Sequence, residues 1–537
     1  MTPMADGKPQ APLMLGVSGL RGIVGESLTP EVAMRFAGAF AAWVRENHAN
    51  QRTDPNVVVG WDGRSGGESI HSWVMTILEY AGLGVYDAGI MTTPTLGVVA
   101  DSHNAHAVQI TASHNPFPWN GIKLLIRPVE ATERGAWAAA PTAAVASEII
   151  RMFEGAPAPL SFNDGARWKS LEAGLSIHGG AIIQELGESE TTRDHDYFRV
   201  FDSSFFCVLD SVNASGGPAA ASLMDSLNCR YVQLHGDNSG IFPHTPEPTA
   251  ENLSGEGGLC DAVPGLKADI GFAQDPDGDR LAIVDETGRY IGEEYTLALC
   301  AVSILEANKH APPSPKGELS AQPTEGVSFD SEKTPFDPAG TGPPPPSATG
   351  EDVFLCANLS TSRMVDDIAA RYGATVVRTA VGEANVVEAM KRLKREGRTV
   401  LLGGEGNGGV IWPEVTYVRD SLGSMALVLS LMARTGKTVS QLVADIPSYA
   451  IVKRKQPLAN KADAQPAIER IAKCYSSEDG SIRVDTQDGV RVDFDDKKAW
   501  VHVRASNTEP ILRLIAEAGD ETTANAILDN VGGLVDE

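Results

Sequence analysis

Residues 109–116, QITASHNP, place a serine hydroxyl beside an imidazole at the end of an apolar run. The run from Ala105 to Thr111 contains neither Gly nor Pro and predicts a buried β-strand. Prolines follow at 116 and 118, and each fixes its own φ and disfavours helix in the residue before it. The pattern therefore predicts that Ser113 lies in a stiff loop at the exit of a strand.

Two interpretations of this loop are open. In one, Ser113 and Asn115 form a polar turn and bond their own backbone. In the other, Ser113 is a nucleophile next to His114. The motif alone does not separate them, so the choice depends on the rest of the chain.

The composition restricts the classes of function. The chain has 537 residues, enough for three or four domains that each bury a core. The formal net charge of -26 argues against nucleic-acid binding, because neutralising a polyanion requires clustered Lys and Arg. A small phosphorylated ligand would need a local binding site.

The cysteines and the N-terminal region predict a cytoplasmic protein. The six cysteines are far apart and form no CxxC pair, which favours reduced thiols. The first residues lack a basic segment followed by an apolar core. The chain also lacks a run of about twenty apolar residues, so no membrane partner is expected.

Strand and helix patterns alternate in three successive units, which predicts α/β layers. The first unit has predicted helices at 30–47, 68–82 and 95–102, and predicted strands at 56–61, 84–88 and 105–111. The second has strands at 206–210, 268–273 and 281–285, with a glycine-rich turn at 215–218. The third has strands at 353–357, 375–378 and 400–403, with helices at 362–372 and 384–395. The segment 16–22 is so rich in glycine that no regular element is expected there.

These patterns give the predicted domain boundaries. The α/β domains are 1–175, 176–308 and 352–447, and a smaller strand-rich α+β domain is 448–537. Residues 309–351 are rich in proline and poor in branched apolar residues, which predicts a disordered surface insertion without a role in chemistry.

An acidic turn, DPDGDR at 275–280, lies between two apolar strands of the second unit. The alternate carboxylates of Asp275, Asp277 and Asp279 can converge on one hard divalent cation and would otherwise repel one another. The alternative is a solvated hairpin turn. An EF-hand is excluded because Arg280 stands where that loop needs glycine. Three carboxylates and a further oxygen would suit octahedral Mg²⁺.

A glycine-rich loop, GEGNGG at 404–409, matches the dinucleotide-binding pattern by its letters. That pattern must open a helix, whereas VIWP follows here. Glu405 and Asn407 offer a carboxylate and an amide, which suit sugar hydroxyls. A loose connection with an incidental acid is the alternative.

A third loop, RASNTEP at 504–510, links two predicted strands. A guanidinium, two hydroxyls, an amide and successive N–H groups could bind a phosphate dianion. The alternative is a polar turn with a surface arginine. Lys123 and Arg21 would be ordinary surface cations on their own.

Together, a hydroxyl nucleophile, an acidic cation site, a hydroxyl-binding loop and a phosphate-binding loop are the parts of phosphoryl transfer on a sugar phosphate. A serine hydrolase is a rival interpretation, but the GxSxG elbow is absent around Ser113. A non-catalytic sugar-phosphate-binding or calcium-binding protein is another, and it would have no use for Ser113.

TASHNP, DPDGDR, GEGNGG and RASNTEP, in this order, closely resemble the four signature loops of the α-D-phosphohexomutase superfamily. The resemblance covers the chain except for the proline-rich insertion. It implies three α/β mixed-sheet domains and a smaller C-terminal α+β domain around a central cleft. It also implies a Mg²⁺-dependent enzyme, a monomer or homodimer, that interconverts hexose 6-phosphate and hexose 1-phosphate. Phosphate would pass through a phosphoserine and a hexose 1,6-bisphosphate, which also activates the enzyme.

The resemblance assigns a role to individual residues of the four loops and their neighbours. The implied catalytic residues are Ser113, His114, Lys123 and Arg21. The implied metal ligands are Ser113, through its phosphoryl group, and Asp275, Asp277 and Asp279. The implied substrate-binding residues are Glu405, Asn407, Arg280, Glu383, Arg504, Ser506, Asn507 and Thr508.

Two departures from the family pattern bear on the substrate. Asn407-Gly408-Gly409 stands where many relatives have Ser-Gly-His, and Glu383 stands where many have a histidine. The GEGNGG form is similar to an archaeal and related bacterial branch of mostly phosphoglucosamine mutases, with phosphomannomutase/phosphoglucomutases among them. We therefore expect glucosamine phosphate as substrate, with Glu383 pairing with its ammonium group. Glucose or mannose phosphate is the alternative.

Overall fold

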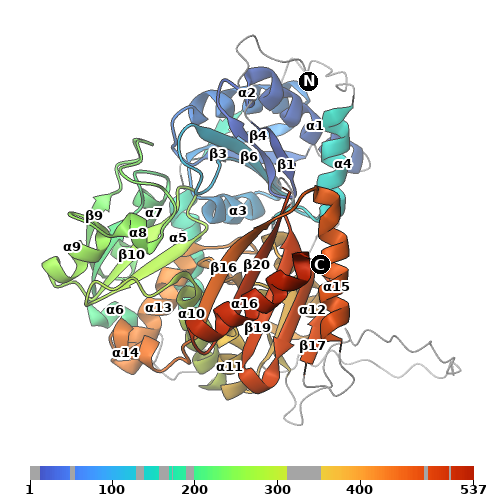
Figure 1. Ribbon diagram of the computed structural model, residues 1–537. Coiled ribbons are helices and arrows are strands. Elements are labelled where there is room, and N and C mark those ends of the chain that lie inside the picture. The colour runs from blue at the N-terminus through green and yellow to red at the C-terminus, as the bar shows by residue number, and fades with distance from the viewer. Residues whose placement is uncertain are drawn as a thin grey trace, which may run out of the picture.

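The computed structural model describes residues 12–48, 55–128, 138–155, 168–171, 173–188, 199–310, 352–476, 482–506 and 510–536. These residues form four β-sheets with their covering helices (Figure 1). Three sheets mix parallel and antiparallel strands and the fourth is antiparallel, which confirms the predicted fold class. Most of the predicted insertion, residues 311–351, lies outside the described residues.

The first sheet presents the loop that contains Ser113. Its strand order is β1-β2-β6-β5-β3-β4-β7, with β3, β4, β5 and β7 parallel and the edge β6-β2-β1 antiparallel. Its strands are β1 (Met14–Gly16), β2 (Gly19–Ile23), β3 (Asn56–Trp61), β4 (Gly84–Ile90), β5 (Ala105–Ile110), β6 (Trp119–Leu125) and β7 (Lys169–Ser170). Its helices are α1 (Pro30–His48), α2 (Gly67–Tyr80), α3 (Thr93–Ser102) and α4 (Ala143–Glu154).

The expectation of no regular element at 16–22 was wrong. These residues form most of the β1–β2 hairpin, and β2 pairs with β6, a strand that the sequence analysis did not predict. Gly19 has φ +95°, and a Cβ there would lie 2.0 Å from the carbonyl oxygen of Ile122. The glycines therefore permit a close approach of backbones, which tertiary structure provides and local pattern does not reveal.

The second sheet holds the acidic turn between two of its strands. Its order is β11-β10-β8-β9, with β11 antiparallel to the rest. Its strands are β8 (Phe206–Asp210), β9 (Arg230–His235), β10 (Ile270–Gln274) and β11 (Leu281–Asp285). The accompanying helices are α5 (Gly174–Glu188), α6 (Arg199–Ser203), α7 (Gly216–Ser226), α8 (Ala250–Leu253), α9 (Leu259–Leu266) and α10 (Glu293–His310).

The predicted glycine-rich turn at 215–218 was also wrong, because α7 begins at Gly216. A Cβ at Gly217 would lie 2.5 Å from the carbonyl oxygen of Gly236. Glycine at this position therefore lets the first turn of the helix pack against the loop after β9.

The third sheet carries the glycine-rich loop at the β14–β15 turn. Its order is β13-β12-β14-β15, with the first three strands parallel and β15 antiparallel to β14. Its strands are β12 (Val353–Asn358), β13 (Thr375–Thr379), β14 (Thr399–Glu405) and β15 (Gly409–Ile411). Its helices are α11 (Met364–Arg371), α12 (Glu383–Arg395), α13 (Ser421–Thr435) and α14 (Val439–Ala444).

The fourth sheet is antiparallel and has the order β16-β20-β19-β18-β17. Its strands are β16 (Ala450–Pro457), β17 (Ile482–Asp485), β18 (Val490–Phe494), β19 (Ala499–Ala505) and β20 (Ile511–Ala518). Helices α15 (Ala464–Tyr475) and α16 (Glu521–Asp536) pack on its core, and 3-10 turns lie at Lys461–Asp463 and Asp495–Lys497. Residues 506–510 lie between β19 and β20, and 507–509 of them are outside the described residues.

A shared hydrophobic core joins the second and third sheets. One hydrophobic core runs from the second sheet, through α10 and α13, to the third, and includes Phe272, Leu299, Met425 and Leu402. The parallel strands β5, β10 and β14 all end close to one group of side chains, because Ser113 contacts Asp275, and Arg419 contacts both Asp279 and Glu405. The carboxyl ends of the strands are where α/β sheets usually bind ligands. Among the described helices, none combines the length and apolar composition that a bilayer crossing requires.

Candidate active site

Ser113 is held in an unusual backbone conformation at the exit of β5. Its φ is +50°, in the left-handed region that non-glycine residues rarely adopt, and the residue is only 1% exposed. The Ser113 N–H donates to Thr111 Oγ1 at 2.8 Å, and the Thr111 hydroxyl donates to Asp62 Oδ2 at 2.6 Å. These bonds fix the direction of the serine side chain.

Arg64 braces the same loop from the end of β3. It donates to the backbone oxygen of Ser113, to that of Asn115 at 3.0 Å and to that of Trp119 at 3.1 Å. Its Nε also donates to Asp62 Oδ2 at 2.7 Å. A single buried guanidinium therefore satisfies three carbonyl groups of the loop, which makes the loop stiff, as the prolines predicted.

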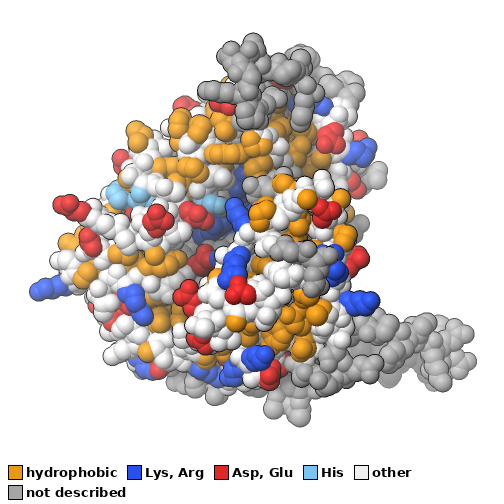
Figure 2. Space-filling view, in the orientation of Figure 1, with side chains coloured by type: hydrophobic (Ala, Val, Ile, Leu, Met, Phe, Trp, Pro, Cys, Tyr) orange, Lys and Arg blue, Asp and Glu red, His pale blue; other side chains and the backbone are white. Residues whose placement is uncertain are grey.

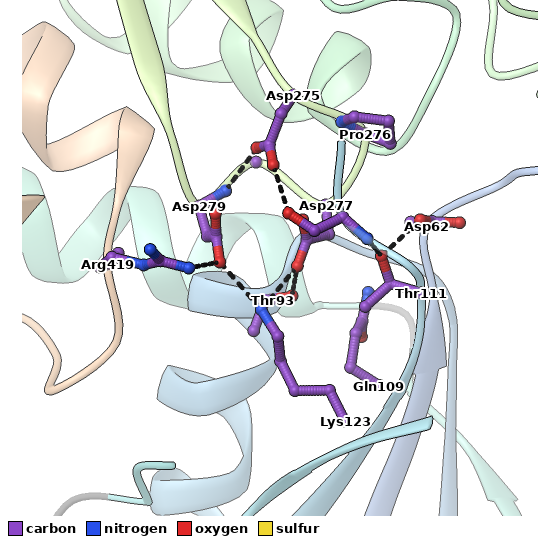
Figure 3. Close-up of polar contacts among 12 residues, drawn as sticks. Asp62, Thr93, Gln109, Thr111, Lys123, Asp275, Pro276, Asp277, Asp279 and Arg419 are labelled. Carbon is purple, nitrogen blue, oxygen red and sulfur yellow. Dashed lines mark hydrogen bonds and ion pairs between the residues drawn. The ribbon is translucent and has the colours of Figure 1, made fainter. Parts of the chain in front are cut away.

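The acidic turn after β10 meets Ser113 directly. Asp275, Asp277 and Asp279 are all fully buried, and one oxygen of each lies within 4.8 Å of the others (Figure 3). Ser113 Oγ donates to Asp275 Oδ2 at 2.8 Å. Asp275 Oδ1 accepts the N–H groups of Asp279 and Arg280, both at 3.1 Å, so the turn is closed around its own first carboxylate.

Two cations converge on this cluster from other sheets (Figure 3). Lys123, on β6, donates from Nζ to Asp277 Oδ2 and to Asp279 Oδ2, both at 2.8 Å. Arg419, which precedes α13, donates to Asp279 Oδ2 at 2.6 Å. The Thr93 hydroxyl, at the start of α3, donates to Asp277 Oδ2 at 2.6 Å. The cluster thus joins the first three sheets.

Burial and mutual repulsion give the three carboxylates different proton affinities. Burial, together with the negative charges of Asp279 and Asp277, raises the pKa of Asp275 well above its usual value. Burial acts in the same direction on the other two, but nearby cations outweigh it and lower the pKa of Asp277 and of Asp279. Lys123 stays charged, because attraction to Asp277 and Asp279 outweighs burial and raises its pKa.

The chemistry of the cluster fits a divalent cation. Asp277 Oδ1 and Asp279 Oδ1 are buried and have no hydrogen-bond partner among the residues that the structure describes. Buried carboxylate oxygens normally find a partner, so these two are available as ligands. Oxygen atoms alone are the donor set that Mg²⁺ prefers.

Arg419 links the acidic cluster to the glycine-rich loop. Besides Asp279, it donates to Glu405 Oε2 at 2.7 Å, and its backbone N–H donates to Glu383 Oε1 at 3.0 Å. The other oxygen of Glu405 accepts from Asn358 Nδ2 at 2.7 Å and from the Gly382 N–H at 3.1 Å. Glu405 is therefore a fixed carboxylate at the end of β14.

Glu383 lies in the same ionic network. Its Oε2 is 3.6 Å from Arg419 Nε, and burial raises the pKa of its carboxyl group despite the attraction of Arg419 and Lys123. Arg419 therefore already contacts both oxygens of this carboxylate.

Asn407 is placed in the turn between β14 and β15, where its Oδ1 accepts the Gly409 N–H at 3.2 Å. The same turn packs on the start of β11, because the Leu281 N–H donates to the Gly408 carbonyl at 3.0 Å. A Cβ at Gly408 would lie 2.5 Å from the Leu281 carbonyl oxygen. Glycine is therefore required for the glycine-rich loop to reach the end of the acidic turn.

The remaining cations surround the buried cluster. Arg21 donates to Asn115 Oδ1 at 3.0 Å and interacts electrostatically with Asp277 and Asp279. Arg280 Nε lies 3.9 Å from Asp279 Oδ1. Figure 2 shows a hollow between the lobes of the molecule, with lysine and arginine side chains gathered at it.

His114 lies close enough to Arg280 and Arg21 to be affected by their charges. Its Nε2 is 4.0 Å from Glu247 Oε1. Burial, together with the positive charges of Arg280 and Arg21, lowers the pKa of His114 to about 3. The imidazole is therefore neutral near pH 7.

The fourth sheet contributes Arg504 and Ser506. Arg504 interacts electrostatically with Glu405 and Asp488, and its Nε is buried without a hydrogen-bond partner in the described parts of the chain. Ser506 is 3% exposed, and its N–H donates to the Ile511 carbonyl at 3.0 Å. Asn507 and Thr508 lie outside the described residues.

Sequence reasoning missed Arg419, Arg64, Asp62 and Thr93. Asp62, Arg64 and Arg419 belong to short connections after a strand or before a helix, where polar residues are common, and Thr93 is the first residue of α3. No spacing distinguishes Arg419 from any other arginine in such a position, although it contacts three acids from two sheets. A sequence signal for Asp62 and Arg64 exists, because Asp-Gly-Arg directly follows a buried strand.

Comparison with known proteins gives a consistent result over the whole chain. Profiles of the phosphoglucomutase/phosphomannomutase family match in order. The alpha/beta/alpha domains I, II and III match residues 12–134, 190–288 and 347–449, and the C-terminal domain matches residues 451–532.

Individual proteins match this chain over nearly its whole length. A "Phosphoglucomutase/phosphomannomutase" of Thermococcus kodakarensis is 32% identical over 96% of this chain and 97% of its own. A "Probable phosphoglucosamine mutase" of Methanopyrus kandleri is 30% identical over 97% of both chains. The crystal structure of a phosphoglucomutase/phosphomannomutase family protein from Burkholderia thailandensis has a TM-score of 0.70 and 23% identity. The match covers 97% of this chain and 98% of that one, and it shows the shared fold.

Proposed function

The chain belongs to the phosphoglucomutase/phosphomannomutase family, and from that premise we propose that it interconverts hexose 6-phosphate and hexose 1-phosphate. The resemblance to the α-D-phosphohexomutase superfamily is thereby confirmed, and the protein is a phosphosugar mutase. The observation that carries the proposed chemistry is the 2.8 Å contact between Ser113 Oγ and Asp275. A hydroxyl in a strained, fully braced loop points into a cluster of carboxylates that fits Mg²⁺.

Ser113 is the phosphoryl carrier. When its oxygen attacks the phosphorus of a hexose 1,6-bisphosphate, the hydroxyl proton must leave. The acceptor that the structure offers is Asp275 Oδ2, which already accepts a hydrogen bond from this hydroxyl. The bond from phosphorus to the sugar oxygen breaks, and that oxygen takes up a proton as the hexose monophosphate leaves. In the second half-reaction, the free hydroxyl of a hexose monophosphate that carries its phosphate at the other position attacks the phosphoserine. The serine oxygen takes up the proton of that hydroxyl, and the bisphosphate is regenerated.

The cations stabilise the charge of the moving group. Mg²⁺ held by Asp275, Asp277 and Asp279 would supply a Lewis acid for the phosphoryl oxygens. Lys123 and Arg21 add fixed positive charge from the first sheet, and Lys123, which contacts two of the aspartates, is the proposed proton donor. A neutral His114 contributes hydrogen bonds rather than charge.

The sugar binds at the glycine-rich loop, and its second phosphate binds at Arg280 and the loop that follows β19. Glu405 and Asn407 grip ring hydroxyls that occupy equivalent places in the two orientations of the hexose. Arg280 and Arg504 bind phosphate oxygens, together with Ser506, Asn507 and Thr508. The buried Nε of Arg504 supports this role, since it has no hydrogen-bond partner among the described residues and is a charged donor that a phosphate would satisfy.

Glucosamine phosphate is the proposed substrate, with Glu383 as the partner of its ammonium group. Several similar proteins are named phosphoglucosamine mutases, whereas the one 32% identical is named phosphoglucomutase/phosphomannomutase. Glucose and mannose phosphates are therefore the second candidate. Because Arg419 already contacts Glu383, we expect Glu383→Gln to reduce the preference for glucosamine over glucose about tenfold rather than abolish it. An unchanged ratio of the two kcat/KM values would remove Glu383 from the account.

The activity is tested by incubating the protein with the 1-phosphates of glucosamine, glucose and mannose. Mg²⁺ and catalytic glucose 1,6-bisphosphate are present, and the 6-phosphates are quantified. We expect turnover of glucosamine 1-phosphate above that of the other two, and loss of turnover with a chelator. The proposal fails if no hexose phosphate is isomerised, or if Ser113→Ala is as active as the wild type.

A further inference from the structure

A second group of metal-ligating side chains lies at the carboxyl end of the second sheet. Asp210 is the last residue of β8 and His235 the last of β9, and the two residues pair across these parallel strands. His244 approaches them from the loop that follows β9. Asp210 Oδ2 lies 3.1 Å from His235 Nδ1 and 3.0 Å from His244 Nε2. One atom of each side chain lies within 4.8 Å of the others.

Backbone groups form hydrogen bonds with the outer atoms of His244 and Asp210, that is, with the atoms that point away from the centre of the group. His244 Nδ1 is 2.9 Å from the carbonyl oxygen of Thr245, which can only accept, so Nδ1 carries a proton. In a neutral ring, Nε2 then presents a lone pair to Asp210. The other oxygen of Asp210 accepts the Val212 N–H at 3.0 Å.

His235 presents a second ring nitrogen to the same oxygen of Asp210. Its Nδ1 is buried and has no partner with hydrogen-bond geometry among the described residues, although Asp210 Oδ2 is close. A carboxylate oxygen that faces two ring nitrogens is satisfied either by an N–H group on each ring or by one metal ion that all three atoms bind. For His244, whose Nδ1 carries a proton, the first case requires a charged ring, whereas a metal ion leaves the ring neutral.

We propose that Asp210, His235 and His244 bind a transition-metal dication of the Zn²⁺ class, separate from the acidic cluster next to Ser113. Two imidazoles and one carboxylate form a common donor set for Zn²⁺, whereas Mg²⁺ prefers oxygen ligands. Ligands at about 2.0 to 2.1 Å from a tetrahedral zinc are about 3.3 Å apart, so the observed contacts need little adjustment.

The surroundings also suit such a site. The bond from His244 Nδ1 to a backbone carbonyl is the kind that orients metal-bound histidines. The side chains of His235 and His244 are 25% and 22% exposed, while that of Asp210 is 1% exposed. A metal ion could therefore enter from solvent and keep a water molecule as its fourth ligand.

The metal would fasten the loop after β9 to the end of the sheet. Three residues beyond His244 in the same loop, Glu247 lies 4.0 Å from both His114 and Arg280. The metal would therefore also hold the part of this loop that contacts His114 and Arg280, and the site does not depend on the proposed mutase activity.

The test is a zinc titration of the chelator-treated full-length protein in excess Mg²⁺, which occupies the acidic cluster. A chromophoric chelator reports free Zn²⁺, and Co²⁺ serves as a spectroscopic probe. We expect one equivalent of Zn²⁺ and the strong visible absorption of four-coordinate Co²⁺. His235→Ala/His244→Ala should lose both, while Asp277→Asn and the remote His103→Ala should keep them.

Several outcomes would overturn the proposal. These are no Zn²⁺ equivalent in the wild type, an equivalent that survives His235→Ala/His244→Ala, or one that Asp277→Asn removes. If the double variant does not fold, X-ray absorption of the zinc-loaded wild type decides. Scattering from two imidazoles is expected, and its absence would refute the site.

Discussion

Replacing Lys123 by methionine isolates the role of the cation between Asp277 and Asp279. Methionine keeps most of the buried aliphatic stem but removes two charge-assisted hydrogen bonds of 2.8 Å each. Breaking a buried ion pair from one side costs about 3 to 5 kcal/mol. Thr93 and Arg419 still contact the two carboxylates, so we expect a loss of about 3 kcal/mol in unfolding free energy in the presence of a chelator.

Magnesium should then return part of this loss. The carboxylates freed by Lys123→Met repel each other and bind the ion without competition from an ammonium group. At a concentration about 100 times its Kd, a bound ion stabilises a protein by about 2.7 kcal/mol. Turnover should remain about 10² to 10⁴ times below that of the wild type, because Mg²⁺ does not replace the proton donor.

The assay is urea unfolding followed by tryptophan fluorescence, with and without Mg²⁺, beside mutase activity. Lys453→Met is the matched control, since Lys453 pairs with Glu293 at the surface and is 57% exposed. Its loss should cost less than about 1 kcal/mol and should not depend on Mg²⁺. The reasoning is refuted if Lys123→Met unfolds at the same urea concentration as this control in chelator, or if Mg²⁺ stabilises wild type and variant equally.

Three further changes test the framework around the site. Gly19→Ala should lower the melting temperature and cost at least about 2 kcal/mol, because its Cβ would lie 2.0 Å from a carbonyl oxygen of β6 at φ +95°. Arg64→Met should reduce kcat about 100-fold and leave Mg²⁺ affinity unchanged, because the arginine holds the backbone of Ser113; unchanged kcat would contradict this. Burial lowers the pKa of His106 to about 3 in the folded protein. In the unfolded chain the same imidazole binds a proton near pH 6.5, so acidification favours unfolding. Stability should therefore fall between about pH 6.5 and 3, by roughly 2 kcal/mol at pH 5, and urea titrations of His106→Gln should lack this contribution.

The fold was largely predictable because its strands are short apolar runs between turn residues. The predictions at 56–61, 206–210 and 281–285 match β3, β8 and β11 residue for residue. The two wrong predictions share one cause. At 16–22 and 215–218, glycines serve close contacts between distant segments, and a local pattern interprets such glycines as breaks.

The candidate site was predictable only where chemistry is concentrated in a short loop. Ser113 and the three aspartates stand out because a hydroxyl before a proline-rich turn and alternate carboxylates are unusual patterns. Arg419 does not stand out, yet its guanidinium holds Asp279 and Glu405 together across two sheets. Its role depends on the packing of α13 against the second and third sheets, which sequence spacing does not encode.

The most direct test of the central claim is the intact mass of the protein after incubation with glucose 1,6-bisphosphate and Mg²⁺. The account predicts a gain of one phosphoryl group, located on Ser113 by fragmentation, that a hexose monophosphate removes and Ser113→Ala abolishes. An unchanged mass under conditions of measurable turnover, or a phosphoryl group on another residue, would contradict it.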